Sequence, residues 1–412
     1  MRLSVAIAAL ATLITPVLGV GEWGQCGGIN YTGSKTCDSG LVCVYINDWY
    51  YQCQKGATTS SSTRATSTSS TRSSSSTSRS SSSTSRSSSS SSSTPSSSSG
   101  SCSNRTKFKY FGVNESSAEF GQTKWPGVLG TDYTWPSPSS VDYFMGKGMN
   151  TFRIAFLMER MSPISTGLTG SFDSTYLNGL KTIVNYITNK GGYAILDPHN
   201  FARYNNAIIT PSQFQTWWKN MASEFSSNAN VIFDLNNEPH DMSASDAAAL
   251  MQAGINGVRA SGAKQLILVE GTSWSGAWTW VSSGNGDAFK SITDPVNNFA
   301  IEMHQYLDSD GSGTSATCVS STIGVERLTA ATNWLKANNL KGFLGEIGAG
   351  SNDACIAAVK GALCHLQQQG GTWIGALWWA AGPWWGDYFQ SIEPPSGAAI
   401  PRILPEALLP YL

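Results

Sequence analysis

Charged residues are scarce in this chain of 412 residues. They make up 13% of the sequence, against about 25% in an average globular protein, and the formal net charge is only −1. A nucleic-acid-binding protein carries a basic surplus, so this balance argues against nucleic acid as a partner. No apolar run is long enough to span a bilayer, so we expect no membrane segment.

Metal-binding patterns are also missing. The eight cysteines include no CxxC pair, and no two of the four histidines stand at the spacing of ligands on one helix. We therefore expect no metal and no cofactor. The cysteines divide evenly between residues 26–53 and residues 102–364, which is typical of disulfides in a secreted protein.

The first 19 residues have the pattern of a secretory signal peptide. Arg2 gives a positive start, residues 5–13 are apolar, and residues 17–19 offer small or apolar side chains before a cut after Gly19. A buried N-terminal helix is the alternative, but the cysteines and the Ser/Thr tract that follow argue against it. We expect a secreted, extracellular protein.

Composition divides the rest of the chain into three parts. Of the 45 residues 57–101, 37 are Ser or Thr, so this part has no apolar surface with which to fold and we expect an O-glycosylated linker. Residues 20–56 are too few for a self-sufficient core, so their four cysteines must supply the constraint. Residues 102–412 are long enough for a large catalytic domain.

Residues 102–412 alternate strand-like and helix-like stretches at intervals of about 30–45 residues. The strand-like runs are 108–113, 151–156, 193–197, 231–235, 266–270, 299–304, 342–346 and 374–379. Eight such runs predict a (β/α)8 TIM barrel of the α/β class. A doubly wound open sheet would also alternate, but residues 112–115 are not the Gly-rich nucleotide loop expected after its first strand.

Two helices between these runs can be predicted directly. Apolar residues recur at helical spacing from 176 to 187, and Gly191 follows them. Thr210 and Gln213 form a capping box, and the apolar face of residues 214–225 follows.

Barrel enzymes carry their reactive groups where the strands end, so the polar or aromatic residues closing the eight runs are candidates for the active site. They are Asn114, Arg153, His199, Asn200, Asn237, Glu238, Trp274, His304, Tyr306, Glu346 and Trp379. Two of them are glutamates. Pro239 disfavours helical angles at Glu238, which we expect at an extended strand end, and Gly345 lets chain or ligand approach closely beside Glu346.

Two carboxyl groups facing each other across a cleft can cleave a glycosidic bond. One protonates the leaving oxygen while the other attacks the anomeric carbon, so the two need different proton affinities. Arg153 is a candidate for keeping Glu346 ionised, and Glu238, with no adjacent cation in sequence, can keep its proton near neutral pH. On spacing alone, the alternative is that both glutamates belong to structural ion pairs.

Six motifs in the large part resemble the fungal endoglucanases of glycoside hydrolase family 5. They are Thr151-Phe152-Arg153, Asp197-Pro198-His199-Asn200, Asp234-Leu235-Asn236-Asn237-Glu238-Pro239, His304-Gln305-Tyr306, Gly345-Glu346 and Trp378-Trp379-Ala380-Ala381-Gly382-Pro383-Trp384-Trp385-Gly386. They stand in the right order, and the resemblance covers essentially all of residues 105–400.

The resemblance implies a retaining mechanism with Glu238 as general acid/base and Glu346 as nucleophile. It also implies roles for the neighbours: Asn237 binds the sugar 2-hydroxyl, Arg153 and Tyr306 position Glu346, His199 and His304 line the cleavage subsite, and Trp379 is an apolar platform beneath the sugar. Asn114 is a further supporting candidate. Family members often have a cis peptide bond after this tryptophan, so we expect one at Trp379–Ala380.

Residues 22–54 resemble the fungal, family 1, cellulose-binding module, through Trp23-Gly24-Gln25-Cys26-Gly27-Gly28 and Asn47-Asp48-Trp49-Tyr50-Tyr51-Gln52-Cys53. The resemblance implies a small, disulfide-stapled β-rich fold. Its cellulose-binding strip would be Trp23, Trp49 and Tyr50, helped by Asn47 and Gln52, and its disulfides would be Cys26–Cys43 and Cys37–Cys53. A toxin-like or inhibitor domain is the alternative.

Four cysteines remain in the large part, and sequence alone does not fix their connectivity. We expect Cys318–Cys355, which leaves Cys102–Cys364. Three Asn-X-Ser/Thr sequons occur, at Asn30, Asn104 and Asn114, and we expect a glycan at Asn104.

Aromatic residues outside the strand ends divide by position. Trp274, Trp278, Trp384 and Trp385 follow strands and are either sugar subsites or core residues. Trp217, Trp218 and Trp334 stand in helix-like stretches and are expected in the core.

Together these features predict a secreted, monomeric enzyme that makes internal cuts in the β-1,4-glucosidic bonds of cellulose and soluble β-glucan chains. Two alternatives stay open. The same machinery could act on β-1,4-mannan or xyloglucan, because substrate choice depends on loop contacts. A non-catalytic wall-binding protein is the other, and the pair of glutamates argues against it.

Overall fold

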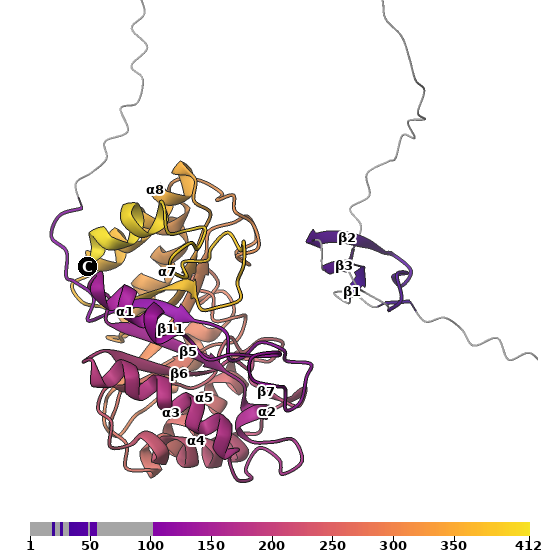
Figure 1. Ribbon diagram of the computed structural model, residues 1–412. Coiled ribbons are helices and arrows are strands. Elements are labelled where there is room, and N and C mark those ends of the chain that lie inside the picture. Colours follow the sequence, from indigo (N-terminus) through magenta and orange to yellow (C-terminus); the bar gives the residue numbers. More distant parts are fainter. Residues whose placement is uncertain (1–18, 21–24, 28–32, 48–49, 56–101) are drawn as a thin grey trace, which may run out of the picture. The chain divides into compact units, whose positions relative to one another are not determined.

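The computed structural model describes residues 19–20, 25–27, 33–47, 50–55 and 102–412 (Figure 1). The chain divides into two compact units, of which the described residues up to 55 form one and residues 102–412 the other. The expected signal peptide, except its last residue, and the expected linker lie outside the described residues. Within the described part, no helix has the length and apolar character needed to cross a membrane.

The smaller unit is a three-stranded antiparallel sheet in the order β1-β3-β2. Its strands are β1 (Gln25–Gly27), β2 (Leu41–Asn47) and β3 (Tyr50–Lys55). Disulfides join Cys26 to Cys43 and Cys37 to Cys53, the two expected pairs. In a unit this small, these crosslinks take the place of a large hydrophobic core.

The larger unit is a closed barrel of eight parallel strands surrounded by helices (Figure 1). Around the barrel the strands are β4 (Tyr110–Glu115), β5 (Thr151–Phe156), β6 (Tyr193–Pro198), β9 (Val231–Asp234), β10 (Ile267–Glu270), β11 (Phe299–Tyr306), β12 (Gly342–Gly348) and β13 (Trp373–Ala381), and β13 pairs with β4. Each strand coincides with a predicted run, and the ends differ by no more than two residues. The prediction of a TIM barrel is confirmed.

Helices follow the barrel strands and cover the outside. The longer ones are α1 (Pro138–Gly146), α3 (Ser174–Asn189), α4 (Pro211–Phe225), α5 (Ala244–Ala260), α7 (Ile323–Ala337) and α8 (Asp353–Gln367). Short elements are α2 (Met158–Met161), α6 (Asn285–Ala288), η1 (Phe289–Ser291), η2 (Leu404–Leu408), η3 (Leu409–Tyr411) and the hairpin of β7 (Arg203–Tyr204) with β8 (Ala207–Ile208). Both helices predicted from the sequence, α3 and α4, are present, and Thr210 and Gln213 form the expected capping box.

The interior of the barrel changes from apolar to charged along the strands. Near the start of the strands it is filled by a cluster that includes Ile195, Ile232, Leu268 and Ala300. Side chains two residues apart on a strand share a face, and two residues beyond these positions stand Asp197, Asp234, Glu270 and Glu302, all fully buried. The barrel therefore carries a layer of acidic groups directly beneath its C-terminal end.

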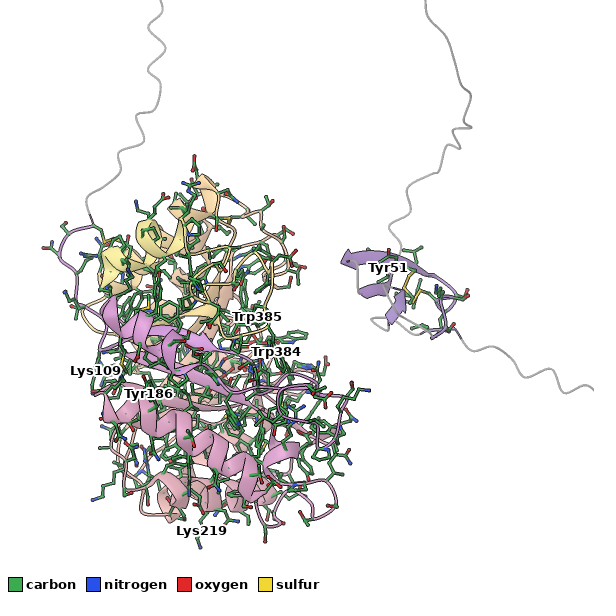
Figure 2. All side chains as sticks on the ribbon, in the orientation of Figure 1. Tyr51, Lys109, Tyr186, Lys219, Trp384 and Trp385 are labelled. Atoms are coloured by element: carbon green, nitrogen blue, oxygen red, sulfur yellow. A yellow bond between two sulfur atoms is a disulfide. The ribbon has the colours of Figure 1, made fainter. Side chains whose placement is uncertain are left out.

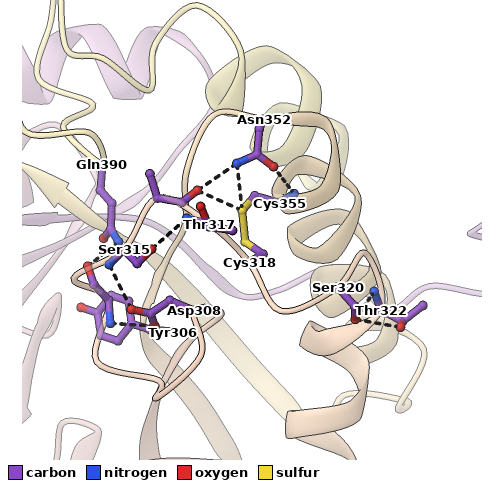
Figure 3. Close-up of a disulfide and its surroundings, with 12 residues drawn as sticks. Tyr306, Asp308, Ser315, Thr317, Cys318, Ser320, Thr322, Asn352, Cys355 and Gln390 are labelled. Atoms are coloured by element: carbon purple, nitrogen blue, oxygen red, sulfur yellow. Dashed lines mark hydrogen bonds between the residues drawn. A yellow bond between two sulfur atoms is a disulfide. The ribbon is translucent and has the colours of Figure 1, made fainter. Parts of the chain in front are cut away.

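Two disulfides brace the larger unit. Cys102–Cys364 ties its first residues to α8, and Cys318–Cys355 ties the loop after β11 to the start of α8 (Figure 3). These are the expected pairs.

Candidate active site

Glu238 and Glu346 meet at the C-terminal end of the barrel. Glu346 lies within β12, and Glu238 follows the end of β9 by four residues. An oxygen of each, together with a ring nitrogen of His304, lies within 4.8 Å of the others. Carboxyl groups about 5–5.5 Å apart are typical of retaining glycosidases, whereas inverting enzymes need about 6.5–9.5 Å to admit a water molecule. The geometry therefore fits the retaining arrangement.

The backbone at Glu238 differs from the expectation of an extended strand end, which was wrong. Its φ of 46° lies in the left-handed region. A proline at position 239 disfavours right-handed helical angles but does not by itself select extended ones. The N–H of Glu238 donates to Glu270 Oε2 at 2.8 Å, and this bond holds the left-handed conformation, which is costly for a residue with a side chain.

Glu346 is surrounded by hydrogen-bond donors. Its Oε1 accepts from Arg153 Nη1 at 2.9 Å and its Oε2 accepts from the Tyr306 hydroxyl at 2.5 Å. The side chain is almost fully buried. Because both oxygens accept from the protein, the arrangement suits a carboxylate, the form that a nucleophile needs.

Glu238 has different surroundings. Burial raises its pKa to about 7, although the nearby positive charges act against this rise. Its Oε1 lies 2.8 Å from His304 Nδ1. A carboxyl group with this pKa is largely protonated just below neutral pH, as a general acid requires. The two glutamates therefore have unlike surroundings, and the raised pKa of Glu238 is the one that a proton donor needs.

Arg153 is the central cation of the site and is fully buried. Within 3.4 Å it contacts the carboxylates of Asp197, Asp234, Glu270, Glu302 and Glu346. It also donates to the side-chain oxygens of Asn114 and Asn237. Arg153 thus fixes the positions of the groups around Glu346 and compensates part of their charge.

Two of the remaining predicted residues, Asn114 and Asn200, are buried and bond to the backbone around the site. Asn114 is fully buried and donates to the carbonyls of Gly345 and Trp378, so it supports the site and does not reach a ligand. Asn200 accepts from the N–H of Met158 and also belongs to the scaffold.

His199 and Trp379 lie against each other at the C-terminal end of the barrel. Their ring centroids are 5.4 Å apart with the planes 18° from parallel, and Asp197 Oδ2 lies 2.8 Å from His199 Nδ1. The Trp379–Ala380 bond is cis, as expected. Trp385 packs edge-on against Trp379, and Tyr388, which the sequence did not suggest, stacks on Trp385.

A cavity of about 480 Å³ is lined by Glu238, Trp274 and Trp278, among others. Both tryptophan side chains are about half exposed. The Trp274 ring stacks on His240, and the Arg327 guanidinium lies 4.3 Å from the Trp278 ring centre. Rings held rigidly from behind with one face free are suited to stacking on sugars.

The other tryptophans divide into one half-exposed residue and three core residues. Trp384 is about half exposed and neighbours Trp385 on the loop after β13 (Figure 2). Trp217, Trp218 and Trp334 are buried, which confirms that they belong to the core.

Tyr306 is held by the loop that follows it (Figure 3). Asp308 accepts the backbone N–H groups of Gly313, Thr314 and Ser315. Gly313 lies so close to the Tyr306 ring that a Cβ there would stand 2.5 Å from it. Because the Cys318–Cys355 disulfide ends the same loop, the loop fixes the ring whose hydroxyl binds Glu346.

The acidic layer beneath the site was missed in the sequence. It consists of Asp197, Asp234, Glu270 and Glu302. Asp234 and Glu302 stand inside the predicted runs, and Asp197 and Glu270 are the last residues of theirs, whereas most of the candidates follow at the strand ends. A period of two counted back from His199 and His304 would have found Asp197 and Glu302.

Two groups of described carboxylate and imidazole atoms are compact enough to surround a cation. They are Glu238, His304 and Glu346, and Glu270, Glu302 and His304. The guanidinium of Arg153 lies 2.9 Å from Glu346 and 3.3 Å from Glu270. A positive charge is thus already present beside both groups, which disfavours a metal ion there.

The expected cellulose-binding strip lies largely outside the described residues. Trp23 and Trp49 are not among them, and Asn47, Tyr50 and Gln52 are described only by their backbone in β2 and β3. The neighbouring Tyr51 packs on Gly27, where a Cβ would stand 2.7 Å from the ring (Figure 2). Gly27 therefore provides the close approach that this ring needs.

Comparisons with known proteins agree with this geometry. Residues 111–382 match the model of cellulase (glycosyl hydrolase family 5), and residues 22–50 match the fungal cellulose binding domain. Among curated relatives, Endoglucanase 3 of Humicola insolens is 48% identical and Endoglucanase gh5-1 of Neurospora crassa is 52% identical. Each alignment covers 92% of this chain and 92% of the relative.

Solved structures give the same result. The structure of XacCel5A in complex with cellopentaose aligns with a TM-score of 0.70 and 40% identity, over 74% of this chain and 99% of that one. Cel5A (EG2) from Hypocrea jecorina (Trichoderma reesei) aligns with a TM-score of 0.65 and 29% identity, over 71% and 94%. With a fungal cellulose-binding domain at its N-terminus, the chain belongs to glycosyl hydrolase family 5.

Proposed function

We propose that this chain is a secreted endo-β-1,4-glucanase that cuts within cellulose and soluble β-glucan chains with retention of configuration. The observation that supports it most is the pair of facing glutamates with unlike surroundings: Glu346 accepts from Arg153 and Tyr306, while burial raises the pKa of Glu238 to about 7. The relatives named endoglucanase supply the substrate class.

The reaction has two steps. In the first, a Glu346 oxygen bonds to the anomeric carbon while the glycosidic bond breaks and the Glu238 proton passes to the leaving oxygen. In the second, Glu238 takes a proton from a water molecule, whose oxygen bonds to the anomeric carbon and displaces Glu346. Water is consumed, and both side chains return to their starting forms.

The surrounding residues have supporting roles in this proposal. Arg153 and Tyr306 orient Glu346. Asn237 accepts from Arg153 through its Oδ1, and its Nδ2, which lies 3.2 Å from His199 Nε2, is the group that we assign to the sugar 2-hydroxyl. His199 and Trp379 line the cleavage position, and Trp274 and Trp278 bind the leaving side of the chain. Trp23, Trp49, Tyr50, Asn47 and Gln52 bind the cellulose surface, and the enzyme acts as a monomer.

The test is hydrolysis of carboxymethyl cellulose and of β-mannan in parallel, followed by reducing ends and by viscosity. We expect rapid viscosity loss on the cellulose derivative, none with Glu346→Gln, and full activity with Glu224→Gln, whose glutamate lies on the surface of α4. Activity mainly on mannan would keep the mechanism and change the substrate. An active Glu346→Gln would refute the nucleophile.

The module is tested separately by binding to insoluble cellulose. Trp49→Ala with Tyr50→Ala should lower the bound fraction of the full chain severalfold, because stacked rings supply most of such binding. Hydrolysis of the soluble substrate should stay unchanged. An unchanged bound fraction would refute the strip.

A further inference from the structure

The charges beneath the two glutamates do not balance. Arg153 is the single arginine or lysine in contact with the carboxyl groups of Asp197, Asp234, Glu270, Glu302 and Glu346 in the described residues, and all of them are buried. The guanidinium cannot compensate five carboxylates in a medium of low dielectric constant, even with the His199 ring, whose pKa is raised to about 9, lying 2.8 Å from Asp197. Some of these groups must therefore hold protons.

Glu302 is the carboxyl group best suited to hold one. Within the described residues, neither of its oxygens has a hydrogen-bond partner, and its side chain is fully buried. Burial, followed by the charge of Asp234, raises its pKa well above the usual range. Gly345 makes the position possible, since a Cβ at residue 345 would lie 1.7 Å from Glu302 Oε1.

His304 stands between Glu302 and the proposed acid/base. Its Nδ1 lies 2.8 Å from Glu238 Oε1, whereas its Nε2 lies 3.7 Å from Glu302 Oε1 and has no hydrogen-bond partner among the described residues. Burial lowers the pKa of His304 to about 4, so at neutral pH the ring has one N–H donor and one acceptor nitrogen. The oxygens of Glu270, at a similar distance, are engaged by Arg153 and by the N–H of Glu238.

Among the described residues, Glu302 has Arg153 Nε at 3.4 Å but no hydrogen-bond partner, and His304 Nε2 has none either, so the acid and the ring nitrogen face each other in the buried interior. We propose that Glu302 is a positioning residue: its carboxyl proton is directed at His304 Nε2 and holds the imidazole as the tautomer whose Nδ1–H donates to Glu238 Oε1. This inference rests on the proposed role of Glu238 as general acid/base.

The tautomer decides where the Glu238 proton sits. When Nδ1–H donates to Oε1, the acid proton of Glu238 is confined to Oε2, where it is free to reach the leaving oxygen. If the ring carried its hydrogen on Nε2 instead, Nδ1 would accept the Glu238 proton and withhold it from the substrate. Glu302 therefore keeps the proton available without touching the substrate.

Other charged groups face the same ring and must be kept constant in a test. They are Arg153 on β5, Asp197 on β6 with His199 after it, Asp234 on β9, Glu270 on β10 and Glu346 on β12. Substitutions at residue 302 alone leave all of them in place.

The test compares Glu302→Gln with Glu302→Met. The amide is neutral, has the shape of the acid and can donate to Nε2, so Glu302→Gln should retain kcat on β-glucan within about threefold. Glu302→Met cannot donate and should lose kcat by about 10- to 100-fold. On an aryl cellobioside whose leaving group needs no proton, the loss in Glu302→Met should fall below about threefold.

A second readout is independent of activity. In the ¹⁵N spectrum of the intact protein labelled at histidine, His304 should have a protonated Nδ1 and an unprotonated Nε2 in the wild type and in Glu302→Gln. In Glu302→Met the protonation of the two His304 nitrogens should be reversed, or their signals should be averaged. This spectrum keeps the inference testable even if Glu302→Met is too unstable to assay.

Any of four outcomes would overturn the inference, and the first three come from the kinetics and the spectrum. They are wild-type kcat on β-glucan in Glu302→Met, equal losses of kcat in Glu302→Gln and Glu302→Met, and a wild-type His304 protonated at Nε2. Equal losses are the result expected if Glu302 is an ionised partner of Arg153. Loss of activity in a chelator, restored by a divalent cation, would also place a cation where we place the proton. Failure of the proposed function is distinguishable, because the wild type would then cleave none of the substrates.

Discussion

At the scale of single residues, Glu238 and Glu346 show how neighbours give two identical side chains opposite properties. Glu346 accepts hydrogen bonds from Arg153 and Tyr306, groups that sit on β5 and β11 and reach it from two sides. Among the described residues, no arginine or lysine donates to the Glu238 side chain, and the backbone N–H of Glu238 donates to Glu270. In the proposed mechanism, position in the barrel, and not residue type, separates the attacking group from the proton donor.

The pH dependence follows from Glu238. Its pKa is raised to about 7 by burial, and in its proposed role as general acid it must be protonated. We expect kcat/KM on soluble β-glucan to fall tenfold per pH unit above about 7. On an aryl cellobioside whose leaving group needs no proton, kcat/KM should show no such fall over the same pH range. An alkaline limb shared by both substrates would point to another group.

Arg153 is the residue whose loss should be most severe. Arg153→Met leaves the surrounding carboxylates without their cation and should lower the free energy of unfolding by about 3–5 kcal/mol. Arg153→Lys restores the charge without the planar fork that binds several acceptors at once. It should recover most of the stability, measured by urea denaturation, but leave activity at least about 100-fold below wild type. Full activity in Arg153→Lys would show that Arg153 contributes only its charge and not the planar geometry of its guanidinium.

At the level of single residues, the sequence predicted the site residues at the strand ends but not the acidic layer beneath them. His199, Glu238, His304, Tyr306 and Glu346 do converge at one end of the barrel. Glu302 stands inside a strand and Glu270 at the end of one, and neither position gives a local signal of burial. Only closure of the barrel brings the acids together. The φ of Glu238 was also unpredictable locally, since its partner is 32 residues away.

At the scale of elements, the eight strands were predictable because each is an isolated apolar run between polar stretches. The loops were not, although they complete the site. Trp274 and Trp278 lie between β10 and β11, and the loop that fixes Tyr306 lies between β11 and α7. Their conformations depend on tertiary contacts, such as the one between Gly313 and the Tyr306 ring, which a sequence pattern does not contain.

The loop after β11 can be tested through its disulfide. Cys318→Ala with Cys355→Ala should lower the free energy of unfolding by about 2–4 kcal/mol. It should also raise KM or lower kcat severalfold, because the loop holds Tyr306 against Glu346. The matched control is Cys102→Ala with Cys364→Ala, which should lower stability without changing kinetics. Identical kinetic effects of the two pairs would exclude a specific role for the loop.

At the scale of the whole molecule, buried acids make stability depend on pH. Burial raises the pKa of Asp234 to about 7 and that of Glu270 and Glu302 well above their usual values. The folded state therefore binds more protons than the unfolded state at pH values above about 4. The stability contributed by these protons is complete below that pH and is lost as pH rises through the folded values.

Thermal denaturation between pH 4.5 and 8 measures this effect. We expect the melting temperature to fall as pH rises across the range, and to fall less in Glu302→Gln, which holds no titrating group at that position. A melting temperature that rises with pH, or an unchanged slope in Glu302→Gln, would contradict the assignment of a proton to Glu302.

Glycosylation also depends on the folded whole. Asn104 is exposed, whereas Asn114 is fully buried with its amide bonded to Gly345 and Trp378. We expect mass spectrometry of the secreted protein, after peptide N-glycosidase treatment, to find deamidation at residue 104 and none at 114. Asn104→Gln should remove the glycan from the larger unit with little change in activity. A glycan on Asn114 would contradict the buried position of its side chain in the barrel.

The Cys102–Cys364 disulfide gives the molecule a mechanical property. If one unit grips a solid surface while the other moves along a chain, tension enters the barrel domain at residue 102. The crosslink passes that pull directly to α8, so β4, which begins at Tyr110 and closes the barrel against β13, bears none of it. Reduction of this bond would turn the same pull into a force that peels the first strand from the barrel.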